Sequence, residues 1–278
     1  MAKEIVNVNG MSQKSIQKTT LRNINEISKK EQKNAEEIST GKKINSSSDD
    51  LAGFALAEQI HAQIQGLDMA SKNSQDGISM VQTADGALGE VNDMLTRARE
   101  LTIQAGNGAL SENERNIIKN ELNQLGEGIA DIANNTEFNE KKLLDGSSKN
   151  ATLQVGANEG QTTEVDFSTD FNEIAEKIKN IDLSSGDIAS QLNSIDESID
   201  QVNSVRSEYG ATVNALGSTA SSLDVSSVNL SNAKSVITDS DMAKSFAENI
   251  RLAFRRDTVT TMVAQSEALL GGLGSVLN

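Results

Sequence analysis

The side chains that could perform nucleophilic or metal-dependent chemistry are scarce in this sequence. His61 is the single histidine among 278 residues, and cysteine is absent. A nucleophilic site needs a base beside its nucleophile, and the zinc-protease motif needs two histidines on one helix face. A lone histidine after Ile60, within an apolar helical pattern, is more commonly structural. The sequence therefore predicts a protein that is not an enzyme and has no cofactor and no metal site.

Two pairs of acidic residues could instead hold a cation. Asp49 and Asp50 end a run rich in asparagine and serine at residues 44–50, and Asp239 and Asp241 lie in a similar short polar segment. Acidic side chains are also favoured at helix N-termini, where free N–H groups and the helix dipole attract negative charge. We therefore interpret both pairs as helix caps.

Positive charge gathers near the C-terminus but does not dominate the chain. Arg251, Arg255 and Arg256 could contact nucleic acid or lipid, yet the formal net charge is −15. Nucleic acid phosphates and anionic membranes both select for an excess of lysine and arginine. We interpret the three arginines as partners in ion pairs within or between subunits, and expect neither nucleic acid nor a membrane as a partner.

One segment shows a long heptad repeat, and it sets the expected architecture. From Ile188 to Ile237, residues at alternating steps of four and three are apolar except Arg206, Ser227 and Lys234, the pattern of a helix packed along its length against other helices. Such a helix would be roughly 75 Å long, and no proline interrupts it. The seam residues are Ile188, Leu192, Ile195, Ile199, Val202, Tyr209, Val213, Leu216, Leu223, Leu230 and Ile237.

Two further helices are expected before this segment. The first covers residues 51–105, and its apolar stripe continues in phase through four glycines, which we interpret as places of close helix approach. They are Gly66, Gly77, Gly86 and Gly89. The second follows a capping box formed by Ser111 and Glu114 and ends near residues 134–135.

The ends and the middle of the chain have different patterns. A first helix is expected to begin after residue 10 and to end at Gly41, and a last helix to run to Leu277. Residues 138–186 contain two short alternating runs separated by turn signals, which predict a small β-hairpin. A short helix at residues 172–181 could follow the hairpin.

These elements predict a mainly α fold: a long antiparallel coiled coil or helical rod, with the terminal helices paired and one small β-hairpin element. The terminal helices can pair because the chain is expected to double back on itself. The expected segments are an N-terminal helix at 1–40, a connecting loop at 41–54, the first half of the rod at 55–137, the hairpin or variable segment at 138–186, a long rod helix at 187–238 and a C-terminal helix at 239–278.

Several motifs resemble those of bacterial flagellin, the subunit of the flagellar filament. Residues 38–55 are similar to the family segment LSSG-x-RIN-x-x-x-DDAAG-x-A, and further motifs follow across most of the chain. They are residues 73–79 (NSQDGIS), 82–88 (QTADGAL), 99–107 (RELTIQAGN), 136–139 (TEFN), 142–146 (KLLDG), 153–160 (LQVGANEG), 230–233 (LSNA) and 237–241 (ITDSD). The resemblance implies a core domain built from both termini and a helical rod domain outside it, in a minimal form without large outer domains.

The resemblance also implies roles for individual residues. The spoke motif maps onto Ile44, Asn45, Asp49, Asp50 and Gly53. Arg97, Leu101 and Glu121 match positions by which animal Toll-like receptors recognise the rod domain of this family. The alternative is that these residues belong to an ordinary rod face that packs between neighbouring subunits.

The terminal helices depart from the family pattern. Glu37 and Ile38 stand where the family usually has arginine and leucine, and residues 29–34 contain no apolar member. Arg255 and Arg256 lie in a stretch that the family fills with apolar, glutamine, alanine and glycine residues. These departures fall in the helices that form the filament core.

The implied function is that of a structural subunit that polymerises into the flagellar filament for swimming motility. It would be exported as an unfolded chain without a cleaved signal peptide and would be extracellular. Its partners would be copies of itself, the export apparatus, an export chaperone, the hook-junction and cap proteins, and a Toll-like receptor as a further candidate. The alternatives are a hook–filament junction protein and, in a different class, a chemoreceptor-like coiled-coil signalling module.

Overall fold

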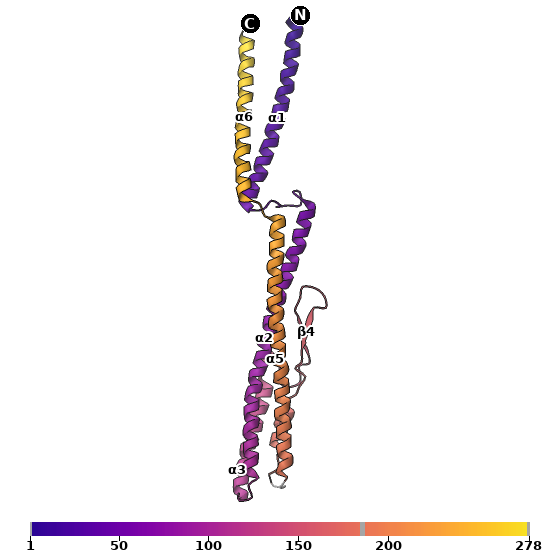
Figure 1. Ribbon diagram of the computed structural model, residues 1–278, viewed down its shortest axis with the longest axis vertical. Coiled ribbons are helices and arrows are strands. Elements are labelled where there is room, and N and C mark those ends of the chain that lie inside the picture. Colours follow the sequence, from indigo (N-terminus) through magenta and orange to yellow (C-terminus); the bar gives the residue numbers. More distant parts are fainter. Residues whose placement is uncertain (1, 184–186, 277–278) are drawn as a thin grey trace. The chain divides into compact units, whose positions relative to one another are not determined.

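The computed structural model describes residues 2–183 and 187–276 of the chain (Figure 1). Most of these residues are helical, so the mainly α fold is confirmed. The elements are α1 Ala2–Thr40, α2 Leu51–Ala105, α3 Glu112–Asn135, β1 Glu137–Phe138, β2 Lys141–Lys142, β3 Ala151–Gln154, β4 Thr162–Val165, α4 Asn172–Lys179, α5 Ile188–Thr238 and α6 Met242–Val276. Leu277, the expected end of the last helix, lies outside the described residues.

The chain divides into two compact units. The terminal unit comprises residues 1–61 and 230–278, and the central unit comprises residues 62–229. α1 and α6 belong to the terminal unit, α3, α4 and the strands belong to the central unit, and α2 and α5 contribute to both. Each unit has buried apolar side chains of its own.

The core of the central unit gathers around α2 and α5. On α5, Ile195, Val202, Tyr209 and Leu216 are buried at intervals of seven residues, so one line of the heptad faces inward. On α2, buried side chains recur every three or four positions through most of this unit. Phe167 packs against Tyr209 with ring centroids 5.5 Å apart.

α3 begins at the predicted capping box and supports α4. Glu114 N donates to Ser111 Oγ at 3.3 Å, and Ser111 N donates to Glu114 Oε2 at 2.7 Å. α4 packs against α3. Gly126 permits this approach, because a Cβ at that position would lie 2.7 Å from Lys179 Cγ and 3.1 Å from Ala175 O.

The predicted hairpin forms from β3 and β4 and lies against α2. The strands are antiparallel, with Ala151 opposite Val165, and Asn73 Nδ2 of α2 donates to Gln154 O at 3.0 Å. A second hairpin, which the sequence analysis did not predict, pairs β1 with β2. Its turn residue Asn139 has φ 49°, in the left-handed region that asparagine tolerates.

Two of the four glycines in α2 are places of close approach. A Cβ at Gly77 would overlap Leu153 of the hairpin and would also approach α5, and one at Gly66 would lie 2.9 Å from an alanine Cβ in the hairpin turn. The same expectation is wrong for Gly86, which has nothing within 4 Å, and for Gly89, whose nearest neighbour is an arginine side chain at 4.0 Å.

In the terminal unit, main-chain hydrogen bonds join the two helix breaks, which are the loop between α1 and α2 and the short segment between α5 and α6. Lys43 N donates to Thr238 O at 2.7 Å, and Ser240 N donates to Gly41 O at 2.9 Å. Gly41 has φ 70°, a conformation that costs little without a Cβ. The loop between α1 and α2 is therefore fixed to the junction of α5 and α6.

α1 and α6 lie side by side, which confirms the expected pairing of the terminal helices (Figure 1). Among the side chains of this unit whose burial the structure describes, few apolar ones are buried; Ile27 of α1 and Leu252 of α6 are two of them. α1 begins at Ala2 rather than after residue 10, so the helix is longer than its apolar pattern indicates. The pair is therefore long but buries little apolar surface.

Candidate functional site

α6 carries a row of exposed apolar side chains. Met242, Phe246, Ile250 and Phe254 follow at steps of four residues, so they share one side of the helix. Their exposed fractions are 39, 52, 70 and 75%, and that of Met262, further along, is 64%. Large apolar side chains grouped in this way mark interaction surfaces. We refer to these five residues as the α6 row.

A hollow of about 400 Å³ lies between the middle parts of α1 and α6. Leu21 of α1 and Met262 of α6 line it, and both remain largely exposed. The other lining residues are Gln17, Thr20, Asn23, Val259, Val263 and Ser266. The two helices therefore leave apolar surface uncovered between them as well as along the row.

Asp49 closes the loop between α1 and α2. Its Oδ2 accepts the N–H groups of Asn45 and Ser46, both at 3.1 Å, and Lys33 Nζ lies 2.9 Å from its Oδ1. The hydrogen bond from Lys33, followed by that from Asn45, lowers the pKa of Asp49 to about 2. The carboxylate is thus a fixed part of the loop.

The neighbouring acidic residues are helix caps. Asp50 Oδ1 accepts the backbone N–H groups two and three residues later, at 3.1 and 3.0 Å. Gly53 must lack a side chain there, because a Cβ would lie 2.7 Å from the Cδ1 of buried Ile44. At α6, Asp241 Oδ1 accepts Lys244 N at 3.1 Å. Within the described residues, no group of three or more histidine, cysteine or acidic side chains could hold a metal ion.

The face expected to contact receptors or subunits is an exposed ion-pair cluster on α2 and α3. Arg97 Nη2 lies 2.8 Å from Glu121 Oε1, and Arg97 Nη1 lies 3.1 Å from Glu100 Oε2. The side chains of Arg97 and Glu121 are 50 and 42% exposed. Leu101 is only 1% exposed and lies in the core beneath them. The three residues are therefore neighbours, but only the charged two are accessible.

The residues of the heptad seam on α5 are all buried or half-buried. Arg206, which interrupts the apolar pattern, donates from Nε to Asp85 Oδ1 of α2 at 2.9 Å. Arg99 of α2 similarly donates to Asp196 of α5 at 2.6 Å. Ion pairs at the edges of the seam therefore join the same two helices as the apolar side chains within it.

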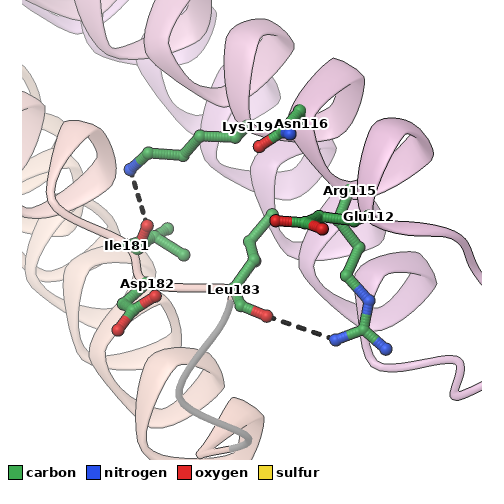
Figure 2. Close-up of a pocket in the computed structure, with 7 residues that line it drawn as sticks. All are labelled: Glu112, Arg115, Asn116, Lys119, Ile181, Asp182 and Leu183. Atoms are coloured by element: carbon green, nitrogen blue, oxygen red, sulfur yellow. Dashed lines mark hydrogen bonds between the residues drawn. The ribbon is translucent and has the colours of Figure 1, made fainter.

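A polar hollow of about 200 Å³ lies at the end of α4, and Figure 2 shows the residues that line it. Lys119 Nζ donates to the carbonyls of Lys179 and Ile181 at 2.5 and 2.6 Å, and Arg115 Nη1 donates to Leu183 O at 3.3 Å. Burial lowers the pKa of Lys119. Since both cations bind backbone carbonyls at the last residue of α4 or just after it, this arrangement ties the end of α4 to α3.

Two of the three arginines near the C-terminus form ion pairs within the chain. Arg251 Nη2 lies 2.5 Å from Glu248 Oε2, and Arg256 Nη1 lies 2.9 Å from Glu31 Oε1 of α1. Arg255 is exposed and has no ion pair or hydrogen bond with the side chains that the structure describes. The predicted pairing is therefore confirmed within the chain for Arg251 and Arg256.

Comparison with known proteins identifies the family. Residues 11–149 match the bacterial flagellin N-terminal helical region, and residues 192–270 match the bacterial flagellin C-terminal helical region. The chain belongs to the flagellin family. It is 42% identical over 237 residues to the flagellin of Halalkalibacterium halodurans, covering 84% of this chain and 87% of that protein. It is 38% identical over 281 residues to the flagellin of Bacillus subtilis, covering 89% of this chain and 92% of that protein.

A flagellar hook-associated protein of Vibrio parahaemolyticus shares the fold, with a TM-score of 0.58, 15% identity, and 68% of this chain and 99% of that chain covered. At that identity the likeness concerns the fold alone, whereas the family regions and the relatives above are flagellins. Flagellin is a structural protein family, and the chain is therefore a subunit of the extracellular flagellar filament. In the described part of the chain, no helix has the length and apolar character to cross a membrane.

Proposed function

We propose that this filament subunit polymerises by burying the α6 row and the hollow between α1 and α6 against neighbouring copies, and that the filament serves swimming motility. The α6 row is the observation that carries the proposal. Fully burying a phenylalanine, isoleucine or methionine side chain contributes about 1.5–3 kcal/mol relative to leaving it exposed. Several such side chains per copy can therefore offset the entropy lost when subunits associate.

The terminal unit also suits a chain that orders during assembly. Few of the apolar side chains described in this unit are buried within one copy, so α1 and α6 would gain most of their burial in the polymer. Export as an unfolded chain fits the absence of cysteine and proline, because neither disulfides nor slow prolyl isomerisation would delay it. On this proposal the partners are the export apparatus, an export chaperone, and the hook-junction and cap proteins.

Replacing side chains of the α6 row tests the assembly surface. The Phe246→Ser, Ile250→Ser double variant should leave the monomer's thermal unfolding unchanged but prevent filaments that sediment and are visible by electron microscopy. Thr260→Ala, an exposed position outside the row, is the matched control and should assemble like the original chain. Filaments of the double variant at the original critical concentration would overturn the proposed surface.

The hook-junction alternative makes a different quantitative prediction. A filament subunit is present in many more copies per flagellum than a junction protein, so counting this chain in isolated flagella separates the two. The signalling-module alternative requires mirrored heptads about a central tip, whereas the middle of this chain contains the β3–β4 hairpin.

The exposed Arg97–Glu121 pair supports a second role for the central unit. We propose that it lies on the face that contacts neighbouring subunits and that a Toll-like receptor could recognise. Both uses need accessible charged side chains, which this pair supplies.

A further inference from the structure

A polar cup of about 380 Å³ lies in the terminal unit, where α1 ends and α6 begins. It contains four carboxylates, two lysines, two serines and one asparagine. We call it the acidic cup; it is lined by Asn34, Glu37, Lys43, Asp239, Ser240, Asp241, Lys244, Ser245 and Glu248. The cup is distinct from the α6 row, which is apolar.

Asn34 indicates that the cup lacks a hydrogen-bond donor. The residue is only 7% exposed, and its Oδ1 accepts no hydrogen bond from the described part of the chain. Buried carbonyl oxygens are nearly always paired, because an unpaired one loses its hydration without compensation. Asn34 lines the cup, but its Oδ1 has almost no solvent-accessible surface, so a donor from outside the subunit could satisfy this oxygen once the amide group turns toward the opening.

Most of the other charges in the cup are already engaged. Glu248 pairs with Arg251 at 2.5 Å, and Lys43 Nζ donates to Val236 O at 3.0 Å. Asp239 accepts hydrogen bonds from two hydroxyl groups of α5, and one oxygen of Asp241 caps α6. Three charged groups of the cup therefore remain wholly or partly unpaired among the described residues.

Glu37 and the second oxygen of Asp241 have no hydrogen bond or ion pair with the described residues, and Lys244 is the one lysine of the cup whose ammonium group has none. Two carboxylates against one ammonium group leave a negative excess. Together with the unpaired amide oxygen, this arrangement suits a cation with several N–H donors. A guanidinium group fits best, since it can bind a carboxylate with two parallel hydrogen bonds and still donate to a third acceptor.

Arg255 offers such a group and has no described partner of its own. It lies seven residues before Met262 of the α6 row, which is 64% exposed, so the two side chains lie on the same side of the helix. Burying that row between copies would draw Arg255 into the contact, where an unpaired charge is strongly unfavourable. Within one copy, the backbone of Arg255 lies about 10 Å along α6 from that of Glu248, the nearest α6 residue of the cup. In a single copy the cup remains open.

We propose that the acidic cup of one subunit receives Arg255 of a neighbouring copy in the filament. The inference rests on the proposed polymerisation and specifies one contact within it. The guanidinium would bind Glu37 and donate to Asn34 Oδ1. It would thereby connect two departures from the family pattern, the acidic Glu37 and the basic Arg255, across the subunit boundary.

Charge reversal in separate copies tests the contact. Glu37→Arg and Arg255→Glu should each raise the critical concentration for polymerisation at least tenfold, because like charges then meet. An equimolar mixture of the two variants should restore polymerisation, since each cup then meets an opposite charge on its neighbour. Arg22→Glu, which reverses another exposed arginine of the terminal unit, is the matched control and should not restore assembly when mixed with Glu37→Arg.

Each remaining outcome would overturn the inference. If the cis double variant Glu37→Arg, Arg255→Glu assembles but the mixture does not, the pair forms within one chain. If the single variants assemble normally, or neither combination restores assembly, the contact does not exist.

Asn34→Ala should weaken polymerisation several-fold while leaving the monomer's thermal unfolding midpoint unchanged or higher. A lower midpoint with normal assembly would instead assign Asn34 a structural role. Failure of the original chain to polymerise would instead overturn the proposed function.

Discussion

Arg256 of α6 donates from one nitrogen, Nη1, to both carboxylate oxygens of Glu31 of α1, at 2.9 and 3.0 Å. The two residues are 225 positions apart in the sequence. Their side chains are 42 and 22% exposed, so water screens the pair only partly. Because the terminal helices bury few apolar side chains, this pair helps to fix their alignment.

Replacing Arg256 by glutamine should loosen α1 against α6. We expect a loss of about 1 kcal/mol in the pairing of the helices, the upper end for partly exposed ion pairs. Hydrogen exchange of the α1 amides around residue 31 should therefore quicken several-fold. The effect should shrink in high salt. Arg255→Gln is the control, and equal acceleration in both variants would contradict a specific role for Arg256.

The loop between α1 and α2 should lose its order in acid. Hydrogen bonds from Lys33 and Asn45 hold the folded pKa of Asp49 at about 2, below its ordinary value of 3.8. The stabilisation from the ionised carboxylate is therefore complete above about pH 4 and is lost as the pH falls toward 2. The amide signals of Asn45 and Ser46 should titrate by NMR with a midpoint near 2. Asp49→Asn should abolish this transition; a midpoint near 4 would contradict it.

Two glycines of α2 should respond to alanine in opposite directions. Gly86→Ala should stabilise the chain by about 0.5–1 kcal/mol, because it favours the helix and meets nothing within 4 Å. Gly77→Ala should destabilise it, because the new Cβ overlaps Leu153 and lies 3.2 Å from Leu216 Cδ1. Chemical denaturation measures both changes. Equal shifts would show that the hairpin does not pack closely at Gly77.

Replacing an exposed residue of the candidate recognition face should affect receptor signalling, whereas replacing its buried residue should affect the free energy of unfolding. Arg97→Ala should lower Toll-like receptor signalling at least tenfold while leaving thermal unfolding nearly unchanged, because the side chain is exposed. Leu101→Ala should cost about 2–5 kcal/mol of unfolding free energy, because the residue lies in the core. A receptor reporter assay alongside calorimetry distinguishes them. Unaltered signalling by Arg97→Ala would leave this face to subunit packing alone.

The parts of the fold that the sequence predicts best are governed by local chemistry or long periodicity. The Ser111–Glu114 capping box starts α3, and α2 spans residues 51–105 as its stripe indicates. The heptad places Ile195 and Val202 in the core because burial repeats with the helix. In each case the signal lies within a few turns of the residue that it positions.

The features that the sequence did not predict depend mainly on contacts with segments that are distant in the sequence. Gly77 and Gly86 look alike in the pattern, and only the position of the hairpin makes one crowded and the other open. The β1–β2 hairpin is too short for a periodic signal, and Asn139 at its turn was the one local cue. The pairing of Glu31 with Arg256 and the composition of the acidic cup require the folded positions of α1 and α6.

The main-chain hydrogen bonds between the two helix breaks have an evolutionary consequence. The amides of Lys43 and Ser240 and the carbonyls of Gly41 and Thr238 are present whatever side chains those positions carry. Surrounding residues can therefore diversify, as antigenic surfaces do, without altering how the breaks are joined. A proline at position 43 or 240 would remove one of these donors, so proline is the substitution that the main-chain junction itself excludes at these two sites.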